Sequence, residues 1–141
     1  MSDINYDKFK QSLARLEERY NDYLKHDELG GFLRESVKES CIQRFEICFD
    51  TSWKHIRKYL IEEMGLIDIA NSPNPIFRKA EASKIIVQAE KWIDFNVSRG
   101  DTVHDYSGDK ADKTFEVIPD FIKEAIDVYE IISGEKWQNK K

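Results

Sequence analysis

The chain has few residues of the kinds that interrupt a helix, and no long apolar run. Its 141 residues include three proline and six glycine residues, so few breaks in regular structure are expected. Apolar runs reach only a few residues, as in 85-IIV-87, whereas a helix needs about 20 to cross a bilayer. The opening residues MSDINYDKFK lack the basic and then apolar pattern of a signal peptide, so we expect a cytoplasmic protein.

Cysteine is also scarce, which limits disulfide and metal chemistry. The two cysteine residues, Cys41 and Cys48, are seven positions apart, and in a helix this spacing is a rise of about 10 Å. That separation is too long for a disulfide, and both side chains lie on one helical face. We expect two buried thiols. The cysteine and histidine residues match no zinc spacing, so we expect no metal and no cofactor.

The chain lacks an excess of positive charge. With 22 basic and 27 acidic residues, its formal net charge is −5. Such a balance is unsuited to broad, nonspecific binding to a phosphate backbone. If the protein handles RNA, we expect it to use a local cleft or a partner.

Apolar residues recur with the helical period of 3.6 in four long segments, and no segment alternates as a strand does. We expect helices at about 5–25, 33–64, 85–97 and 109–133, and a short additional helix that starts at Pro75. Pro119 should bend or break the last helix, and the tail from about residue 134 should fray. The predicted fold is an all-α single domain over 1–141, an up-and-down four-helix bundle with an extra short helix.

The helix expected at 33–64 carries two polar features. Its apolar face is broad enough to require more than one neighbour, either within the bundle or across a dimer. Gln43, Glu46 and Asp50 recur at i, i+3 and i+7 among apolar residues. They are either an ordinary polar edge or residues that orient a site elsewhere in the bundle. His55 falls on the polar side of this helix, and we expect it at the surface.

The stretch 98-SRGDTVHDYS-107 gathers Arg99, His104 and Tyr106 within eight residues. Gly100 and the polar run indicate that the helix ends or bends there, which would bring the guanidinium and the imidazole toward one point. Imidazole moves protons near neutral pH, and guanidinium matches phosphate oxygens in a fork. The stretch therefore fits phosphoryl chemistry on RNA without a metal. The alternative interpretation is a capped, solvated helix end.

Two runs resemble a known family. The run 43-QRFEICFDTSWKHIRKYL-60 resembles the signature helix of the bacterial nucleotidyltransferase substrate-binding protein family. The run 99-RGDTVHDY-106 resembles the R-x4-H-x-Y motif of the HEPN superfamily, to which that family belongs. The similarity in order and spacing extends from about Phe9 to Val128. It implies a HEPN-like helical bundle that dimerises and has a minimal nucleotidyltransferase as its partner.

The resemblance leads to a first function hypothesis, a ribonuclease toxin of a toxin-antitoxin pair. In this hypothesis Arg99 and His104 are the catalytic pair of a metal-independent ribonuclease, and both subunits of a homodimer contribute to one cleft. The substrate is RNA, with tRNA expected. Tyr106 is the residue that the partner adenylylates to silence the toxin, because a phosphate added beside Arg99 blocks the cleft by charge and bulk.

The second hypothesis is a noncatalytic subunit that binds a nucleotide or another substrate for a separate nucleotidyltransferase. The acidic balance of the chain supports it. So does Asp101, which puts negative charge beside a site meant for phosphate. Here Arg99 binds phosphate and His104 only donates a hydrogen bond.

Overall fold

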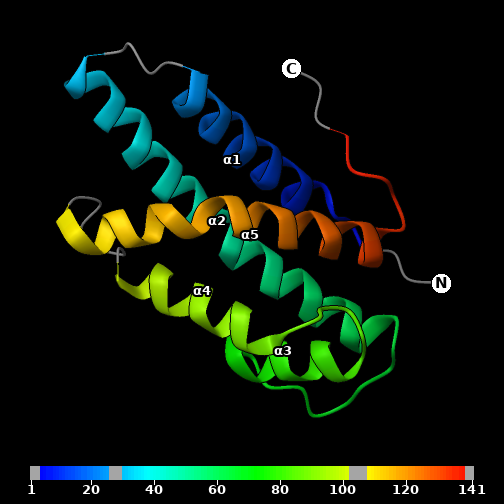
Figure 1. Ribbon diagram of the computed structural model, residues 1–141. Helices are drawn as coiled ribbons and strands as arrows, with labels where there is room; N and C mark the ends of the chain where they lie inside the picture. The colour runs from blue at the N-terminus through cyan, green and yellow to red at the C-terminus, as the bar shows by residue number, and fades with distance from the viewer. Residues whose placement is uncertain (1–3, 26–29, 102–107, 139–141) are drawn as a thin grey trace.

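The structure is a computed structural model that describes residues 4–25, 30–101 and 108–138. Within these ranges every regular element is an α-helix, in agreement with the predicted all-α class (Figure 1). The five helices are α1 (Asp7–Lys25), α2 (Gly31–Glu62), α3 (Pro73–Ala82), α4 (Ala89–Asp101) and α5 (Gly108–Ser133).

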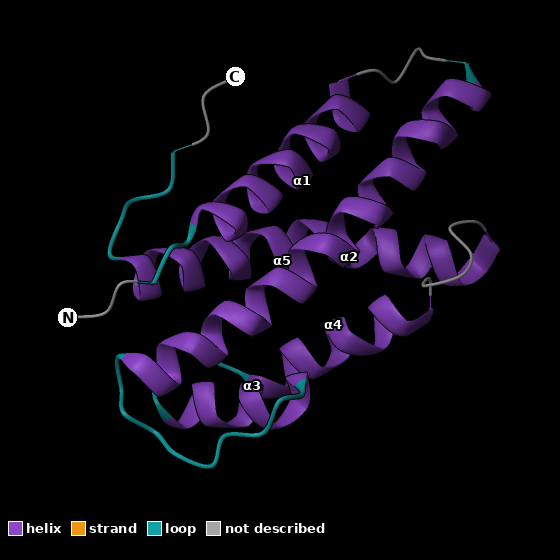
Figure 2. Cartoon of the chain, turned by 180° about the vertical axis from the view of Figure 1, so that it is seen from behind, coloured by secondary structure: helices purple, strands orange, loops and turns teal. Residues whose placement is uncertain are grey.

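The helices form two groups around α2, the longest of them. In the described ranges α1 packs on α2 and α5, while α3 and α4 pack on each other and on α2. The helix α5 crosses α2 and lies between α1 and the α3–α4 pair, as both views show (Figures 1 and 2). The two groups therefore meet through α2 and α5, and each has its own outer surface.

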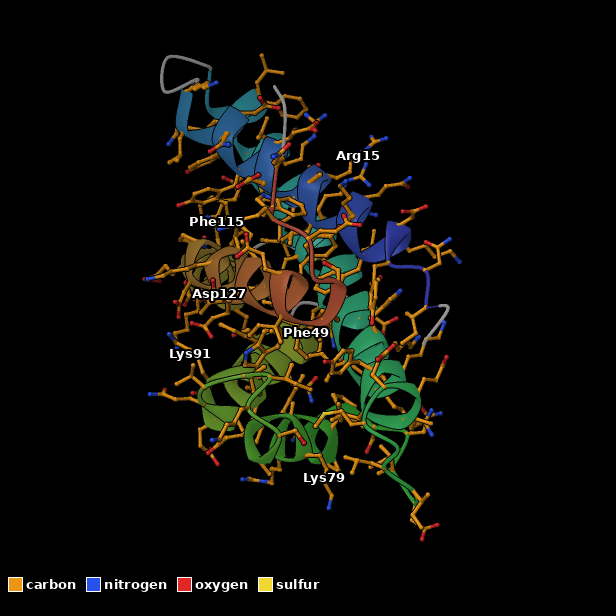
Figure 3. All side chains as sticks on the ribbon, turned by 90° about the vertical axis from the view of Figure 1, so that its right-hand side faces the viewer. Arg15, Phe49, Lys79, Lys91, Phe115 and Asp127 are labelled. Atoms are coloured by element: carbon orange, nitrogen blue, oxygen red, sulfur yellow. The ribbon has the colours of Figure 1, made fainter. Side chains whose placement is uncertain are left out.

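Aromatic rings from four helices form the centre of the core. The ring of Phe121 in α5 lies 5.0 Å from that of Phe45 and 5.6 Å from that of Trp92, between centroids. The ring of Phe49 in α2 lies 5.7 Å from that of Phe77 in α3. All five side chains are buried, and Phe49 is labelled in the interior in Figure 3. Edge-to-face pairs add about 0.5–1.5 kcal/mol each to the free energy gained from burial of apolar area. These contacts therefore hold the four helices α2, α3, α4 and α5 together.

The connection between α3 and α4 explains why α4 starts later than expected. The N–H of Ile85 donates to the carbonyl of Ala80 at 2.8 Å, which places Ile85 in the turn that closes α3. The carboxylate of Glu81 then accepts from the N–H of Ala89 at 2.8 Å and satisfies one of the free donors at the start of α4. As a result α4 begins at Ala89 and reaches Asp101, beyond the end expected at 97.

Pro119 does not break α5, which runs without interruption from Gly108 to Ser133. A proline inside a helix costs about 3 kcal/mol because it removes one hydrogen bond and crowds the preceding turn. Here the proline ring is exposed, while the residues around it, Ile118, Phe121 and Ile122, are buried in the core. Burial of the apolar stripe on both sides of the proline outweighs that local cost.

The prediction that His55 lies at the surface is wrong, because only 7% of the residue is exposed. Its ring lies 5.7 Å from the ring of Tyr6 and 5.9 Å from that of Phe9, between centroids. Nδ1 is 2.8 Å from the carbonyl oxygen of Thr51, and Nε2 is 3.3 Å from that of Asn5. The chain segment that leads into α1 covers this side of α2, which the helical period of α2 alone does not reveal.

The segment after α5, which we expected to fray, makes several contacts. The indole ring of Trp137 packs on Tyr129 at 5.4 Å, and its Nε1 donates to the carboxylate of Glu17 in α1 at 3.2 Å. The main-chain N–H of Trp137 donates to Glu130 at 2.8 Å. Residues 134–137 thus connect the end of α5 to α1.

The prediction of two buried thiols is confirmed. Cys41 and Cys48 are both free and fully buried in α2. Burial raises the pKa of each thiol to about 12. For Cys48 the neighbouring hydroxyl of Ser12 in α1 acts in the opposite direction and lowers the pKa. Both thiols are therefore protonated core residues at neutral pH.

Candidate functional site

Arg99 lies in the last turn of α4 and is half-buried. Its guanidinium carbon is 5.6 Å from the centroid of the Phe49 ring in α2, within the range of a cation–π contact. Nη2 donates to the amide oxygen of Asn96, one turn earlier, at 3.4 Å. The amide nitrogen of Asn96 donates in turn to Asn74 of α3 at 3.1 Å. Residues of α2 and α3 therefore help to position the guanidinium that α4 carries.

The end of α4 is also joined to α5. The hydroxyl of Thr114, in the second turn of α5, donates to the main-chain carbonyl of Ser98 at 3.0 Å. Thr114 is only 1% exposed, so the bond is shielded from water. The carbonyl of Ser98 belongs to the last turn of α4, so the bond links the end of α4 directly to α5. This bond fixes the orientation of the turn that carries Arg99.

His104 and Tyr106 lie outside the described residues. The structure places the ends of the segment that holds them, because α4 ends at Asp101 and α5 begins at Gly108. Arg99 therefore stands one turn before this connection. The proposed meeting of the guanidinium with the imidazole stays a prediction, as does any role of Tyr106.

The three polar residues predicted on α2 do not share one environment. Gln43 is exposed, whereas Glu46 and Asp50 are half-buried. Asp50 accepts a hydrogen bond from Lys54 at 2.8 Å and one from the indole of Trp53 at 3.3 Å. Asp50 thus serves first as a partner for residues of its own helix.

Of this group, Glu46 comes closest to the helical position of Phe49, which Arg99 contacts. It precedes Phe49 by three residues, and residues three apart lie on neighbouring positions of a helical face. The guanidinium of Arg99 packs over the Phe49 ring, so Glu46 is better placed than Gln43 to orient the Arg99 side chain. The orienting role of Gln43, Glu46 and Asp50 stays a prediction.

The residues that support this end of α4 were not predicted from the sequence. They are Phe49, which was assigned only to the core, Asn74, Asn96 and Thr114. One signal was present for Asn96, which precedes Arg99 by three residues and therefore shares its face of the helix. No sequence signal indicated Asn74 or Thr114, because their contacts depend on how α3 and α5 pack against α4.

No group of three or more histidine, cysteine, aspartate or glutamate side chains within residues 4–25, 30–101 and 108–138 is arranged to hold a metal ion. Among the helices of those ranges, none has both the length and the hydropathy that a bilayer crossing requires.

Comparison with known proteins is informative at the level of family and fold. Residues 4–133 match the family described as nucleotidyltransferase substrate binding protein like. A Haemophilus influenzae structure, described as the fold of a substrate binding domain of a nucleotidyltransferase, superposes with a TM-score of 0.81 at 23% identity, over 92% of this chain and 99% of that one. A crystal structure from Thermus thermophilus superposes with a TM-score of 0.71 at 27% identity, over 88% and 98% respectively. No curated protein matches the sequence at a significant level.

Proposed function

Because the chain belongs to the nucleotidyltransferase substrate-binding-protein-like family, we propose that it is the noncatalytic, substrate-binding subunit of a two-component nucleotidyltransferase. The partner is a separate minimal nucleotidyltransferase, which supplies the catalytic groups. This chain holds the nucleotide, or the molecule that receives it, next to the partner's active site. The match over residues 4–133 is the observation that carries the proposal.

Arg99 is the residue we assign to phosphate in this function. A guanidinium keeps its charge at all physiological pH values and binds two phosphate oxygens at once. Its contacts with Asn96 and with the Phe49 ring limit its rotamers before a ligand arrives, so less conformational entropy is lost on binding. His104, five residues later, would donate a hydrogen bond to the same ligand.

The test is a titration of the isotope-labelled chain with ATP, followed through the amide NMR signals of α4. We expect signals at the end of α4 to shift and Arg99→Ala to weaken that binding by at least about tenfold, the usual cost of losing a hydrogen bond to a charged group. The control is Arg78→Ala, because Arg78 is an exposed arginine of α3 that pairs with Glu90 at 3.2 Å. Equal affinity in Arg99→Ala and the wild type would overturn the assignment of Arg99.

A second test addresses the partner directly. The chain and the nucleotidyltransferase encoded nearest to its gene are to be co-expressed, with the tag on one of them. We expect the two to co-purify as a complex. Failure to co-purify with soluble protein on both sides would contradict the proposed two-component function.

A ribonuclease toxin is the second candidate, and the complete set of Arg99, His104 and Tyr106 in the sequence favours it. In this reaction the 2′-hydroxyl of RNA loses its proton to His104 and attacks the adjacent phosphorus. The bond from phosphorus to the 5′-oxygen breaks, a 2′,3′-cyclic phosphate forms, and the leaving oxygen takes up a proton. Arg99 would offset the charge that develops on the phosphoryl oxygens.

The toxin proposal includes a homodimer and a silencing modification. Two copies would each contribute Arg99 and His104 to one cleft, and Val97, two residues before Arg99, is 59% exposed and offers apolar surface to a second copy. Adenylylation of Tyr106 by the nucleotidyltransferase would place a phosphate against Arg99 and block RNA.

The two candidates differ in what happens when the chain is produced alone in a bacterium. A ribonuclease toxin arrests growth, and His104→Ala restores it, whereas Tyr106→Phe stays toxic and cannot be silenced by the partner. A binding subunit leaves growth unchanged in all three forms. Growth arrest that persists in His104→Ala would contradict the catalytic role of that histidine.

A further inference from the structure

A second group of cations, which does not include Arg99, lies in a pocket of about 350 Å³ between α1 and α2. Helix α1 contributes one face through residues at i, i+3, i+4 and i+7, and α2 contributes residues at i, i+3 and i+7. The lining residues are Lys8, Gln11, Ser12, Arg15, Arg44, Ile47 and Thr51. The pocket is in the size range of small-ligand sites, which begins at about 300 Å³.

The pocket has a composition unlike that of the whole chain. The chain carries 27 acidic residues against 22 basic ones, yet the pocket is lined by three cations and by no carboxylate. Within the described part of the chain, Lys8, Arg15 and Arg44 form no ion pair, whereas Arg19 on the same helix pairs with Asp22 at 3.1 Å. No carboxylate among the lining residues therefore neutralises the positive charge of the pocket.

The pairing of α1 with α2 brings two of the cations to the same level. The two helices run antiparallel (Figure 1), and the side chains of Ser12 and Cys48 face each other across the interface. Arg15 lies three residues after Ser12 in α1, and Arg44 lies four residues before Cys48 in α2. Arg15 points outward from α1 in Figure 3 and is exposed, while Arg44 is half-buried. Two like charges side by side repel each other, and an anion between them removes that cost.

The other lining groups leave the cations to do the binding. The hydroxyls of Ser12 and Thr51 already donate to carbonyls of their own helices, at 3.0 and 2.9 Å. The side-chain amide of Gln11 is exposed and can donate. Ile47 is 45% exposed and provides an apolar surface next to the cations.

We propose that the pocket between α1 and α2 binds the polyphosphate chain of a nucleotide, through Arg15, Arg44 and Lys8. Lys8 and Arg15 are separated by a rise of about 10 Å along α1, so the positive charge extends along the pocket. A single small anion would meet only part of that charge, whereas a polyphosphate carries several negative charges in a row. Ile47 gives the nucleoside part an apolar surface. This site is separate from Arg99 and does not depend on the proposed function.

The test uses the whole chain, with inorganic tripolyphosphate, ATP, adenosine and a tetraglutamate peptide as probes. Binding is followed through the amide NMR signals of α1 and α2, which distinguish this pocket from the end of α4. The variant is Arg15→Gln with Arg44→Gln. Its matched control is Lys10→Gln with Lys58→Gln, which removes one exposed cation from each of the same two helices and the same total charge.

We expect tripolyphosphate and ATP to shift signals of α1 and α2, more weakly at higher salt, and adenosine to leave them unchanged. The Arg15 and Arg44 double variant should lose at least about tenfold in affinity for tripolyphosphate, and the control less than about twofold. Arg99→Ala should leave this affinity unchanged, even if it abolishes the shifts in α4.

Three outcomes would overturn the proposal. The first is the absence of shifts in α1 and α2 with tripolyphosphate. The second is an equal loss in the two double variants, which would indicate general attraction to a charged surface. The third is tighter binding of tetraglutamate than of tripolyphosphate, which would assign the pocket to an acidic protein segment. None of these outcomes bears on whether Arg99 binds a ligand.

Discussion

The end of α4 and the pocket between α1 and α2 both carry arginine, but the surroundings differ. Arg99 is set against the Phe49 ring and bonded to Asn96, on a turn that Thr114 joins to α5. Arg15 and Arg44 face a pocket in which no lining residue is acidic. The first arrangement suits one defined phosphate, because the side chain is positioned in advance. The second suits an extended anion, because its charges are spread over two helices.

Replacement of Phe49 by alanine should have the largest effect on the stability of the protein among the variants that test this comparison. The residue is fully buried between Phe77 and Phe121, so we expect the free energy of unfolding to fall by about 3–5 kcal/mol in chemical denaturation. Phe49→Leu keeps most of the volume and removes the ring beneath Arg99. We expect it to weaken ATP binding at α4 while tripolyphosphate binding between α1 and α2 is retained. Equal weakening at both places would show that the two regions are not independent.

Alkaline pH should destabilise the fold beneath the pocket. The pKa of the Cys48 thiol is raised by burial from 9.0 to about 12, so above pH 9 the unfolded chain loses this proton while the folded chain keeps it. Stability is thus present in full below pH 9 and falls as the pH rises toward 12. Urea unfolding at a series of pH values checks this. Cys48→Ala should show a shallower decline over the same rise in pH, and an unchanged decline would contradict the role of this thiol.

Thr114→Val tests the bond that joins α4 to α5. The side chains have similar shapes, but valine removes the hydroxyl that donates to the carbonyl of Ser98 at a buried position. We expect the free energy of unfolding to fall by about 0.5–1.5 kcal/mol, the usual net contribution of one hydrogen bond. Thr51→Val is the matched control, because its hydroxyl bonds at an exposed position to the carbonyl of Ile47 in its own helix. A similar loss in both variants would mean that the contact between helices adds nothing.

Arg15→Glu should have the smallest effect on stability, and of opposite sign. The new carboxylate would face Arg44 in place of a like charge, which we expect to stabilise the fold by about 0.2–1 kcal/mol at low salt. Lys10→Glu, on the same helix outside the pocket, is the control. Arg15→Glu should also abolish tripolyphosphate binding between α1 and α2, whereas Lys10→Glu should not. Destabilisation by Arg15→Glu would indicate that the two arginine side chains do not lie close to each other.

Sequence reasoning succeeded where a residue's own helix decides its environment. The apolar period predicted the helices and the buried thiols of Cys41 and Cys48, and the family resemblance is confirmed by the match over residues 4–133. It failed for His55, whose cover comes from Asn5 and Tyr6, some fifty positions away. For Pro119 the prediction allowed a bend or a break, and the structure excludes the break, because burial along the whole helix outweighs the local cost of the proline.

For the candidate site, too, some features follow from the sequence and others only from the tertiary structure. The sequence by itself determined that Arg99 belongs to a motif, since residue type and spacing are local properties. Only the tertiary structure decided that Phe49, Asn74 and Thr114 position this end of α4, and that Lys8, Arg15 and Arg44 share one pocket. The physical reason is that a helix fixes which of its residues share a face. Which faces then meet depends on the packing of all five helices.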